Sequence, residues 1–117
     1  MEAPILKQGP FLIVSVQGEI RDADLIKLRD SLAQQVGKFR SRGVIVDVTA
    51  LDLLDSFGAR MLRAIAETCK LRGAETVIVG VQPEVAFSMV QLGLTLGNVR
   101  TALDLEDGLA LLRSRRA

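Results

Sequence analysis

The sequence predicts an α/β fold, a mixed and mostly parallel sheet of about five strands covered by about four helices. Apolar, β-branched runs such as residues 44–48 alternate with longer segments in which apolar residues recur every three or four positions. Strands and helices that alternate in this way are typical of βαβ units with right-handed crossovers. The 117 residues suffice for one core and not for two, so a single domain over 1–117 is expected.

The first half of the chain begins with two predicted strands, 5–6 and 11–16, joined by a turn at Gly9-Pro10. Asp22 is then expected to cap a helix that runs to about residue 42 and stops at Gly43. One apolar stripe on this helix should cover the sheet: Leu25, Leu28, Leu32, Val36 and Phe39.

The second half starts with the run 44–48, whose apolar content on both faces predicts the central strand. A helix is expected from about Ser56 to residue 71, a strand at 76–81, and a helix opened by Pro83. A short edge strand at 99–102 and a last helix capped by Asp104 complete the pattern. The apolar side predicted for the helix after Pro83 is Val85, Ala86, Met89, Val90 and Leu92.

Composition removes most enzyme classes. The chain has no histidine and one cysteine, Cys69, so disulfides within the chain, zinc sites with nitrogen and sulfur ligands, and histidine acid–base catalysis are excluded. It lacks the glycine-rich G-x-G-x-x-G turn of dinucleotide-binding units and the G-x-S-x-G elbow of serine hydrolases. We therefore expect a non-enzymatic protein without metal or cofactor, and we expect Cys69 to be a buried hydrophobe.

Charge and hydropathy limit the partners. The formal net charge of +1 provides no field to attract nucleic acid or an anionic membrane. No apolar stretch approaches the roughly 20 residues that span a bilayer, and the first residues lack the order of a signal peptide. The sequence therefore predicts a cytoplasmic protein that binds neither nucleic acid nor membrane.

The pattern of apolar residues changes at Asp55-Ser56, from a continuous run before it to a repeat of about 3.6 residues after it. Serine and aspartate are preferred N-cap residues, so one interpretation of Ser56 is a plain helix cap. The other interpretation is a phosphorylation site, because free N–H groups and the helix dipole favour a phosphate there. The periodicity does not separate the two.

The run IVDVTALDLLDSFGARML resembles the signature of STAS domains of the anti-sigma-factor antagonist family. The similarity extends to PILK, GVIVDVT, GAETVIVGVQPEVA and TALDLEDGLALL, and it is strongest with the scaffold subunits of stressosomes. The resemblance implies a STAS-type fold and makes Ser56 the phosphorylated residue. It favours the phosphorylation site over the plain cap.

The resemblance also implies a function: a regulatory scaffold of a stress-response complex that captures a serine kinase of the GHKL type and releases it when Ser56 is phosphorylated. The implied partners are this switch kinase, larger co-antagonist subunits and further copies of the chain. The alternative is a soluble STAS component of a membrane transport system. Thr49 and Ser88 are expected to stay unmodified, Thr49 because it should end a buried strand and Ser88 because it should lie inside a helix.

The predicted partner surface lies around Ser56. Leu53, Leu54 and Phe57 cannot all reach the core from so short a turn, so at least one should be exposed. Many anti-sigma antagonists have a small residue where Phe57 stands, which favours the scaffold role, and Asp22 occupies the place of a second phosphorylatable threonine in related co-antagonists. The full predicted set of partner contacts is Asp22, Leu53, Leu54, Asp55, Phe57, Gly58 and Arg60.

Overall fold

The computed structural model describes residues 3–18, 20–97 and 99–114. The described chain forms a five-stranded sheet and four helices, the α/β fold expected from the sequence. In chain order the elements are β1 (Ile5–Gln8), β2 (Phe11–Ser15), α1 (Asp22–Phe39), β3 (Gly43–Asp47), α2 (Ser56–Leu71), β4 (Glu75–Val79), α3 (Pro83–Gln91), β5 (Arg100–Ala102) and α4 (Leu105–Ser114).

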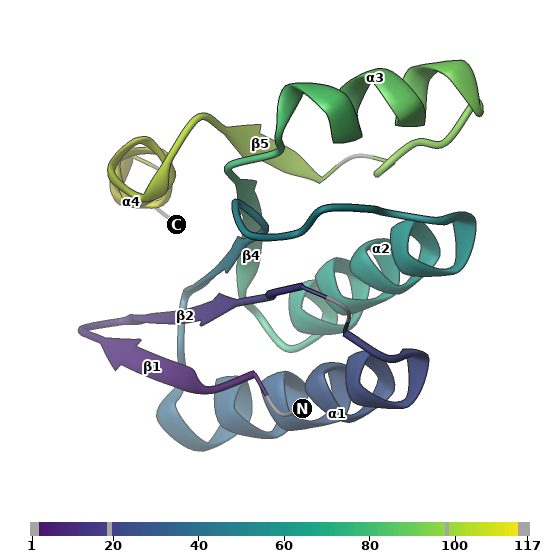
Figure 1. Cartoon of the computed structure of the whole chain (residues 1–117). Coiled ribbons are helices and arrows are strands. Elements are labelled where there is room, and N and C mark those ends of the chain that lie inside the picture. The colour runs from purple at the N-terminus through teal and green to yellow at the C-terminus, as the bar shows by residue number, and fades with distance from the viewer. Residues whose placement is uncertain (1–2, 19, 98, 115–117) are drawn as a thin grey trace.

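The strand order in the sheet is β1-β2-β3-β4-β5, so β3 is central as predicted, between the strands labelled β2 and β4 in Figure 1. The turn at Gly9 and Pro10 makes β1 and β2 an antiparallel hairpin, and every later pair is parallel. Val46 of β3 lies between Val14 and Ile78 in the register. The carboxyl ends of β2, β3 and β4 therefore meet at one edge of the sheet.

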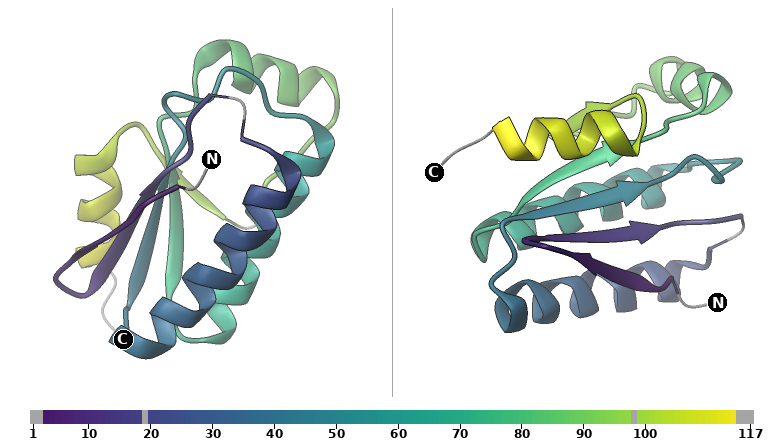
Figure 2. Two further views of the ribbon diagram at one scale, coloured as in Figure 1. Left: turned by 60° about the horizontal axis from the view of Figure 1, so that its bottom comes forward. Right: turned by 90° about the vertical axis from the view of Figure 1, so that its left-hand side faces the viewer.

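Helices cover both faces of the sheet. Figure 2 shows α1 and α2 side by side on one face and α4 on the other. The arrangement explains why β3 reads as a continuous apolar run: Val44 and Val46 face α1 and α2, while Ile45 faces α4.

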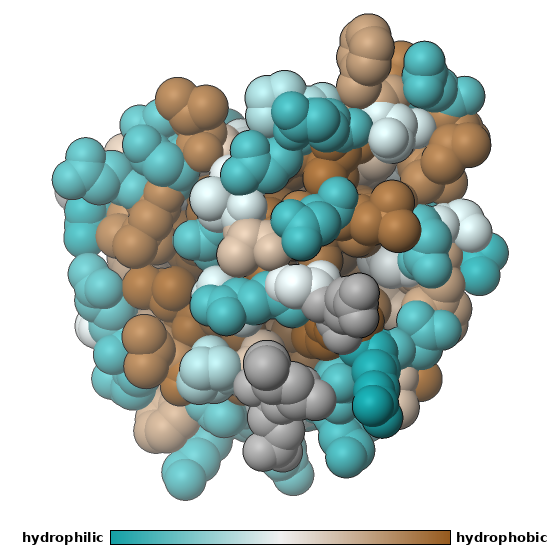
Figure 3. All heavy atoms as spheres, viewed as in Figure 1, coloured by the Kyte–Doolittle hydropathy of each residue, from teal (hydrophilic) through white to brown (hydrophobic). Residues whose placement is uncertain are grey.

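Helix α3 lies beyond the edge of the sheet, at the upper right of Figure 1. Apolar side chains reach the surface in that region of the space-filling view (Figure 3). The prediction of its apolar side was partly wrong: Val85 and Met89 are buried, but Ala86, Val90 and Leu92 are exposed.

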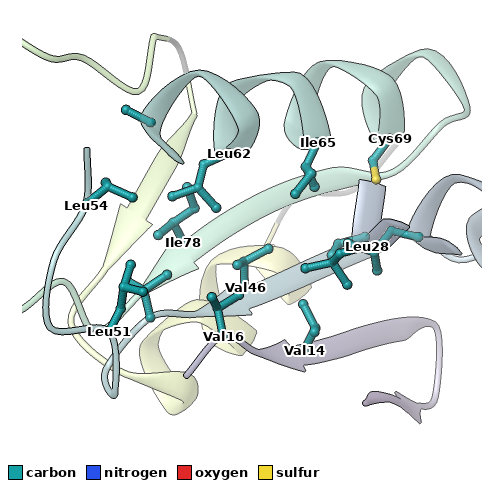
Figure 4. Close-up of a cluster of buried hydrophobic side chains, with 14 of the residues drawn as sticks. Val14, Val16, Leu28, Val46, Leu51, Leu54, Leu62, Ile65, Cys69 and Ile78 are labelled. Carbon is teal, nitrogen blue, oxygen red and sulfur yellow. The ribbon is translucent and has the colours of Figure 1, made fainter. Parts of the chain in front are cut away.

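The larger core fills the space between the sheet and helices α1 and α2 (Figure 4). Ile65 and Cys69 of α2 are fully buried in it, which confirms the predicted place of Cys69. The smaller core joins Phe11, Ile45 and Val77 of the sheet to Leu109 and Leu112 of α4. Among the helices of the described residues, none is both long and apolar enough to cross a membrane.

The ends of α1 differ from the prediction. Its N-cap is Arg21, and Asp22 is the first helical residue, so Asp22 does not cap the helix. The helix stops at Arg40, which adopts a left-handed conformation (φ 52°), whereas Gly43 opens β3. Phe39, the last helical residue, is 38% exposed, so it does not continue the buried stripe, and the ammonium groups of Lys7 and Lys38 lie over its ring.

Candidate phosphorylation and partner-binding site

The segment between β3 and α2 leaves the carboxyl edge of the sheet through a fixed turn. The Asp47 carboxylate accepts a hydrogen bond from the Thr49 N–H (2.8 Å), and the Val48 N–H donates to the Val79 carbonyl (3.0 Å). The Gln82 side-chain amide donates to the Thr49 carbonyl (2.8 Å). The start of the segment is therefore held by β4 and by the residue that precedes α3.

Asp55 is the N-cap of α2. Its backbone is extended, its Oδ1 accepts the Gly58 N–H at 2.7 Å, and its carbonyl accepts the Ala59 N–H at 3.0 Å. Ser56 follows as the first helical residue and is exposed. Because the aspartate fills the capping position, the Ser56 hydroxyl is not the cap, and it stands at the positive end of the helix dipole.

Gly58 makes this turn possible. A Cβ at this position would lie 2.8 Å from Leu54 Cδ1 and 3.2 Å from Asp55 Oδ1. A larger residue would displace either the buried leucine or the capping carboxylate. Gly58 is itself buried, so we interpret its predicted role in partner binding as positioning Ser56, not as direct contact.

The three apolar residues around Ser56 have different environments, as expected from the short turn. Leu53 is 74% exposed, and Phe57 is half-buried. Leu54 is only 8% exposed and packs in the larger core, so its side chain offers little surface to a partner. The physical reason is that the absence of a side chain on Gly58 leaves room for Leu54 beneath α2.

A groove of about 360 Å³ lies beside Ser56 and brings Asp22 to the same place. The loop after β2 is tied to this region because the Gly18 N–H donates to the Ala50 carbonyl (3.0 Å). Asp22, Asp52 and Asp55 all line the groove, above an apolar floor that includes Leu51 and Leu62. The structure therefore places Asp22 and the turn before Ser56 at the same groove, whereas the sequence associated them only through the family resemblance.

Arg60 does not belong to this groove. It lines a separate and larger hollow of about 860 Å³, with Arg63 and Lys70, between α2 and the residues Leu96, Gly97 and Val99. The structure does not place Arg60 beside Asp22 and Asp55, so its role in partner binding stays a prediction.

The accessibility expected for Thr49 was wrong. Strand β3 ends at Asp47, so Thr49 lies in the following turn and is exposed. Ser88 is half-buried within α3, in line with its expected place inside a helix. The bond between Thr49 and Gln82 joins residues far apart in the chain, and no local pattern could have predicted it.

The chemistry of the site suits a modified hydroxyl. The N–H groups of the first turn of α2 and the helix dipole can receive a phosphate, while the three nearby carboxylates oppose it. Among the described residues no group of three His, Cys, Asp or Glu side chains is arranged to hold a metal ion.

Known proteins share this architecture and sequence. Residues 2–108 match the STAS domain family. The chain is 30% identical over 111 residues to the RsbT co-antagonist protein RsbRD of Bacillus subtilis, covering 94% of this chain and 40% of that one. The chain thus spans less than half the length of this relative.

Two solved structures align along almost the whole chain. A serine-to-glutamate variant of RsbS from Moorella thermoacetica superposes with a TM-score of 0.81 at 31% identity, covering 97% of this chain and 96% of that one. A chain from a structure of the stressosome, described as a signal integration and transduction hub, superposes with a TM-score of 0.80 at 32% identity, covering 94% and 96%. The family match and these superpositions agree with the sequence motif around Ser56, and the chain belongs to the STAS domain family.

Proposed function

We propose that this protein is a non-catalytic scaffold and partner-switching subunit of a stressosome-type complex, which captures a serine kinase and releases it when Ser56 is phosphorylated. The observation that carries the proposal is the exposed Ser56 hydroxyl at the first residue of α2, with the capping position already filled by Asp55. A serine in this position is available for modification without loss of the helix cap.

The relatives support the class of function and of partner. RsbS and the stressosome chain are 31% and 32% identical to this protein. RsbRD is described as a co-antagonist of RsbT, so the proposed kinase resembles RsbT and the proposed companions in the complex resemble RsbRD. This identity favours a stressosome-type scaffold over a component of a membrane transport system.

The proposed switch is electrostatic. A phosphate adds a charge of about −1.5 to −2 beside a groove that Asp22, Asp52 and Asp55 already make acidic. A kinase that packs on the unmodified serine would have to bury this phosphate without a matched cation, which costs several kcal/mol. Phosphorylation should therefore weaken binding strongly.

The contact surface that we propose centres on Ser56 and uses Leu53 as its apolar anchor. Leu53 projects beside the capping turn with 74% of its surface exposed, and the half-buried Phe57 extends the apolar area. Asp22 and Asp55 form the polar border of the same surface. Exposed apolar side chains of this kind, rimmed by polar groups, are typical of protein contacts.

The decisive experiment is capture of an RsbT-like kinase by the full chain, followed by phosphopeptide mapping after addition of ATP. Ser56→Ala should hold the kinase with and without ATP, and Ser56→Asp should bind with intermediate affinity because one carboxylate carries less charge than a phosphate. Thr49→Ala is the matched control, since Thr49 is also an exposed hydroxyl at this edge, and it should behave like the wild type. Phosphate on Thr49 with Ser56 unmodified would refute the proposal.

A second comparison tests the contact surface. Leu53→Ala should weaken capture at least about tenfold, the equivalent of 1.4 kcal/mol, while the melting temperature changes little. Leu6→Ala provides the control, because Leu6 is similarly exposed (63%) but lies on β1. Equal affinities of the two variants would place the kinase elsewhere.

A further inference from the structure

The larger hollow, about 860 Å³ in volume, opens between α2 and the residues Leu96, Gly97 and Val99 that lead into β5, and we name it here the α2–β5 hollow. A volume of several hundred Å³ is typical of small-molecule sites. In the described strand pairs β5 meets β4 only from Val77 onward, so Thr76 lies just before this pairing begins. The hollow therefore lies at a place where β4 has not yet gained its outer neighbour.

A buried hydroxyl without a partner lines the hollow. Thr76 is 5% exposed, and within the described structure its Oγ1 takes part in no hydrogen bond. Thr76 shares a face of β4 with Ile78, which packs in the core beneath α1 and α2. Buried hydroxyl groups are nearly always hydrogen-bonded, so an unpartnered one that lines a hollow points to a polar atom that binds there.

Charged side chains differ between the two ends of the hollow. Arg60 and Arg63 line it in the first half of α2, and Lys70 lines it at the end of the helix. No ion pair between described residues involves these three cations. Glu67, one turn before Lys70, and Glu75, just after the helix, also line the hollow and offset the charge of the lysine. The surplus positive charge therefore lies at the two arginines.

The wall opposite α2 is apolar and held in place. Leu96 and Val99 supply its apolar side chains. Between them Gly97 has a left-handed conformation (φ 69°), and its N–H donates to the Thr95 hydroxyl oxygen (3.0 Å). A Cβ on Gly97 would lie 3.4 Å from Arg63 Cδ, so the stem of this arginine runs close to the wall. Apolar walls with a few placed polar groups are typical of ligand sites.

We propose that the α2–β5 hollow binds an elongated monocarboxylate that has an apolar chain and a hydroxyl group at its far end. Arg60 and Arg63 hold the carboxylate, the chain lies on Leu96 and Val99, and the Thr76 hydroxyl bonds the far hydroxyl. From Arg60 to Lys70 the helix extends about 15 Å, so a chain of about ten carbons matches the length of the hollow.

The charge of the lining favours a ligand with a single negative charge. Three cations and two carboxylates line the hollow, which leaves a surplus of one positive charge. One carboxylate balances that surplus. A ligand with several phosphate groups would bring negative charges that the lining cannot pair, and unpaired charges are costly to bury.

The hollow is separate from the proposed switch site. Among the described residues, none that lines the hollow also lines the groove beside Ser56. Ligand binding is measured on the full chain without a kinase, and kinase capture is measured without the ligand. The failure of one proposal therefore leaves the other unaffected.

The test is an NMR titration of the isotope-labelled full chain with three probes of equal chain length. The probe ω-hydroxydecanoate carries both polar groups, decanoate lacks the hydroxyl, and α,ω-decanediol lacks the charge. We expect ω-hydroxydecanoate to bind with a Kd of about 0.1–1 mM, as for other ligands of this size. It should bind about tenfold more tightly than the diol and at least about threefold more tightly than decanoate. The amide signals that shift should centre on Ala66, Gly97 and Val99.

Two sets of variants separate the two polar contacts. Arg63→Gln should weaken binding of both carboxylates about tenfold and leave binding of the diol unchanged. Arg113→Gln is the matched control, because Arg113 lies on α4 at the other face of the sheet (Figure 2). Thr76→Val should abolish the preference for ω-hydroxydecanoate over decanoate, whereas Thr76→Ser, which keeps a hydroxyl, should retain it.

The Thr76 hydroxyl also has a readout that needs no ligand. Because valine has the same shape and no unpartnered polar group, Thr76→Val should raise the melting temperature of the free protein by roughly 4 °C. A lower melting temperature would show that the hydroxyl already has a partner within the protein, which refutes the proposed contact.

The proposal is also refuted if the wild type binds none of the probes or binds all three equally. Amide shifts centred outside the hollow would place the ligand elsewhere and refute it as well. A preference for carboxylates over the diol that survives in Arg63→Gln would show that the arginine does not hold the carboxylate.

Discussion

At the residue scale, the site depends on a division of roles between neighbours. Asp55 caps α2, Gly58 leaves the space for that cap and for Leu54, and Ser56 remains exposed between them. Both aspartate and serine are good N-cap residues, so the sequence alone left two interpretations of Ser56. The hydrogen bond from the Gly58 N–H to Asp55 shows that Asp55 is the cap, and phosphorylation of Ser56 stays a proposal.

Cys69 carries a prediction about the pH dependence of stability. Burial raises the pKa of its thiol from the ordinary value of 9.0 to about 11. The folded state therefore resists loss of the proton, whereas the unfolded chain loses it near pH 9. The stabilisation is complete below the unfolded pKa and is lost as the pH rises from about 9 to 11, by up to about 3 kcal/mol.

Urea denaturation between pH 8 and about 11.5 measures this loss, with Cys69→Ala as the reference that has no thiol to titrate. The alanine variant should start from a lower stability, because it leaves a cavity in the core, and then lose less free energy of unfolding over the same interval. Parallel curves for the two proteins would show that the thiol makes no contribution to the pH dependence.

At the element scale, α4 is held close to the sheet by a glycine. A Cβ on Gly108 would lie 2.7 Å from Val79 Cγ1 and 2.8 Å from Ile45 Cδ1, two fully buried side chains. The strands cannot yield without disturbing the centre of the sheet, so α4 would have to move outward. In the described chain α4 is the helix that covers this face, and the smaller core depends on its position.

Gly108→Ala should therefore destabilise the protein by about 1–3 kcal/mol, despite the better helix propensity of alanine. Gly37→Ala in α1 is the matched comparison, because there the neighbour is the flexible guanidinium end of Arg72. That end can move aside, so this variant should gain up to about 1 kcal/mol from helix propensity. Chemical denaturation of the two variants gives the difference, and a neutral Gly108→Ala would mean that α4 packs more loosely than the structure indicates.

At the scale of the whole molecule, the proposed switch site is separated from most of the core. Ser56 lies at the carboxyl edge of the sheet, where the chain leaves β3, while the buried residues fill the two layers behind it. A change of charge at this edge alters a surface and leaves the packing between sheet and helices intact. The fold therefore permits a large change in binding with a small change in stability.

Phosphorylated protein should accordingly keep a cooperative melt. An anion at a helix N-terminus contributes about 0.3–1 kcal/mol, and the carboxylates of Asp52 and Asp55 oppose this, so the melting temperature should shift by only a few degrees. Kinase affinity should fall at least tenfold under the same conditions, in line with the several kcal/mol needed to bury the phosphate. A phosphorylated form without a cooperative transition would show that the switch works by unfolding.

The sequence by itself determined the architecture, and it indicated where the proposed site lies. The sequence correctly predicted the strands, the hairpin turn at Gly9-Pro10 and helix α2. It also predicted that Asp104 caps α4, and the hydrogen bond from the Asp107 N–H to the Asp104 carboxylate (2.9 Å) confirms this. These features depend on local periodicity, turn residues and capping residues, each of which involves only residues close together in the sequence. The motif around Ser56 likewise indicated the family.

Only the tertiary structure decided which side chains are buried at the ends of elements and in the loops. Leu53 and Leu54 are adjacent and chemically identical, yet one is exposed and the other packs beneath α2. In α3 the spacing of apolar residues could not tell the face toward the core from the face toward solvent, and Thr49 is exposed because β3 ends two residues earlier. The physical reason is the same in each case: burial depends on contacts between segments distant in the chain, whereas periodicity records only neighbours along it.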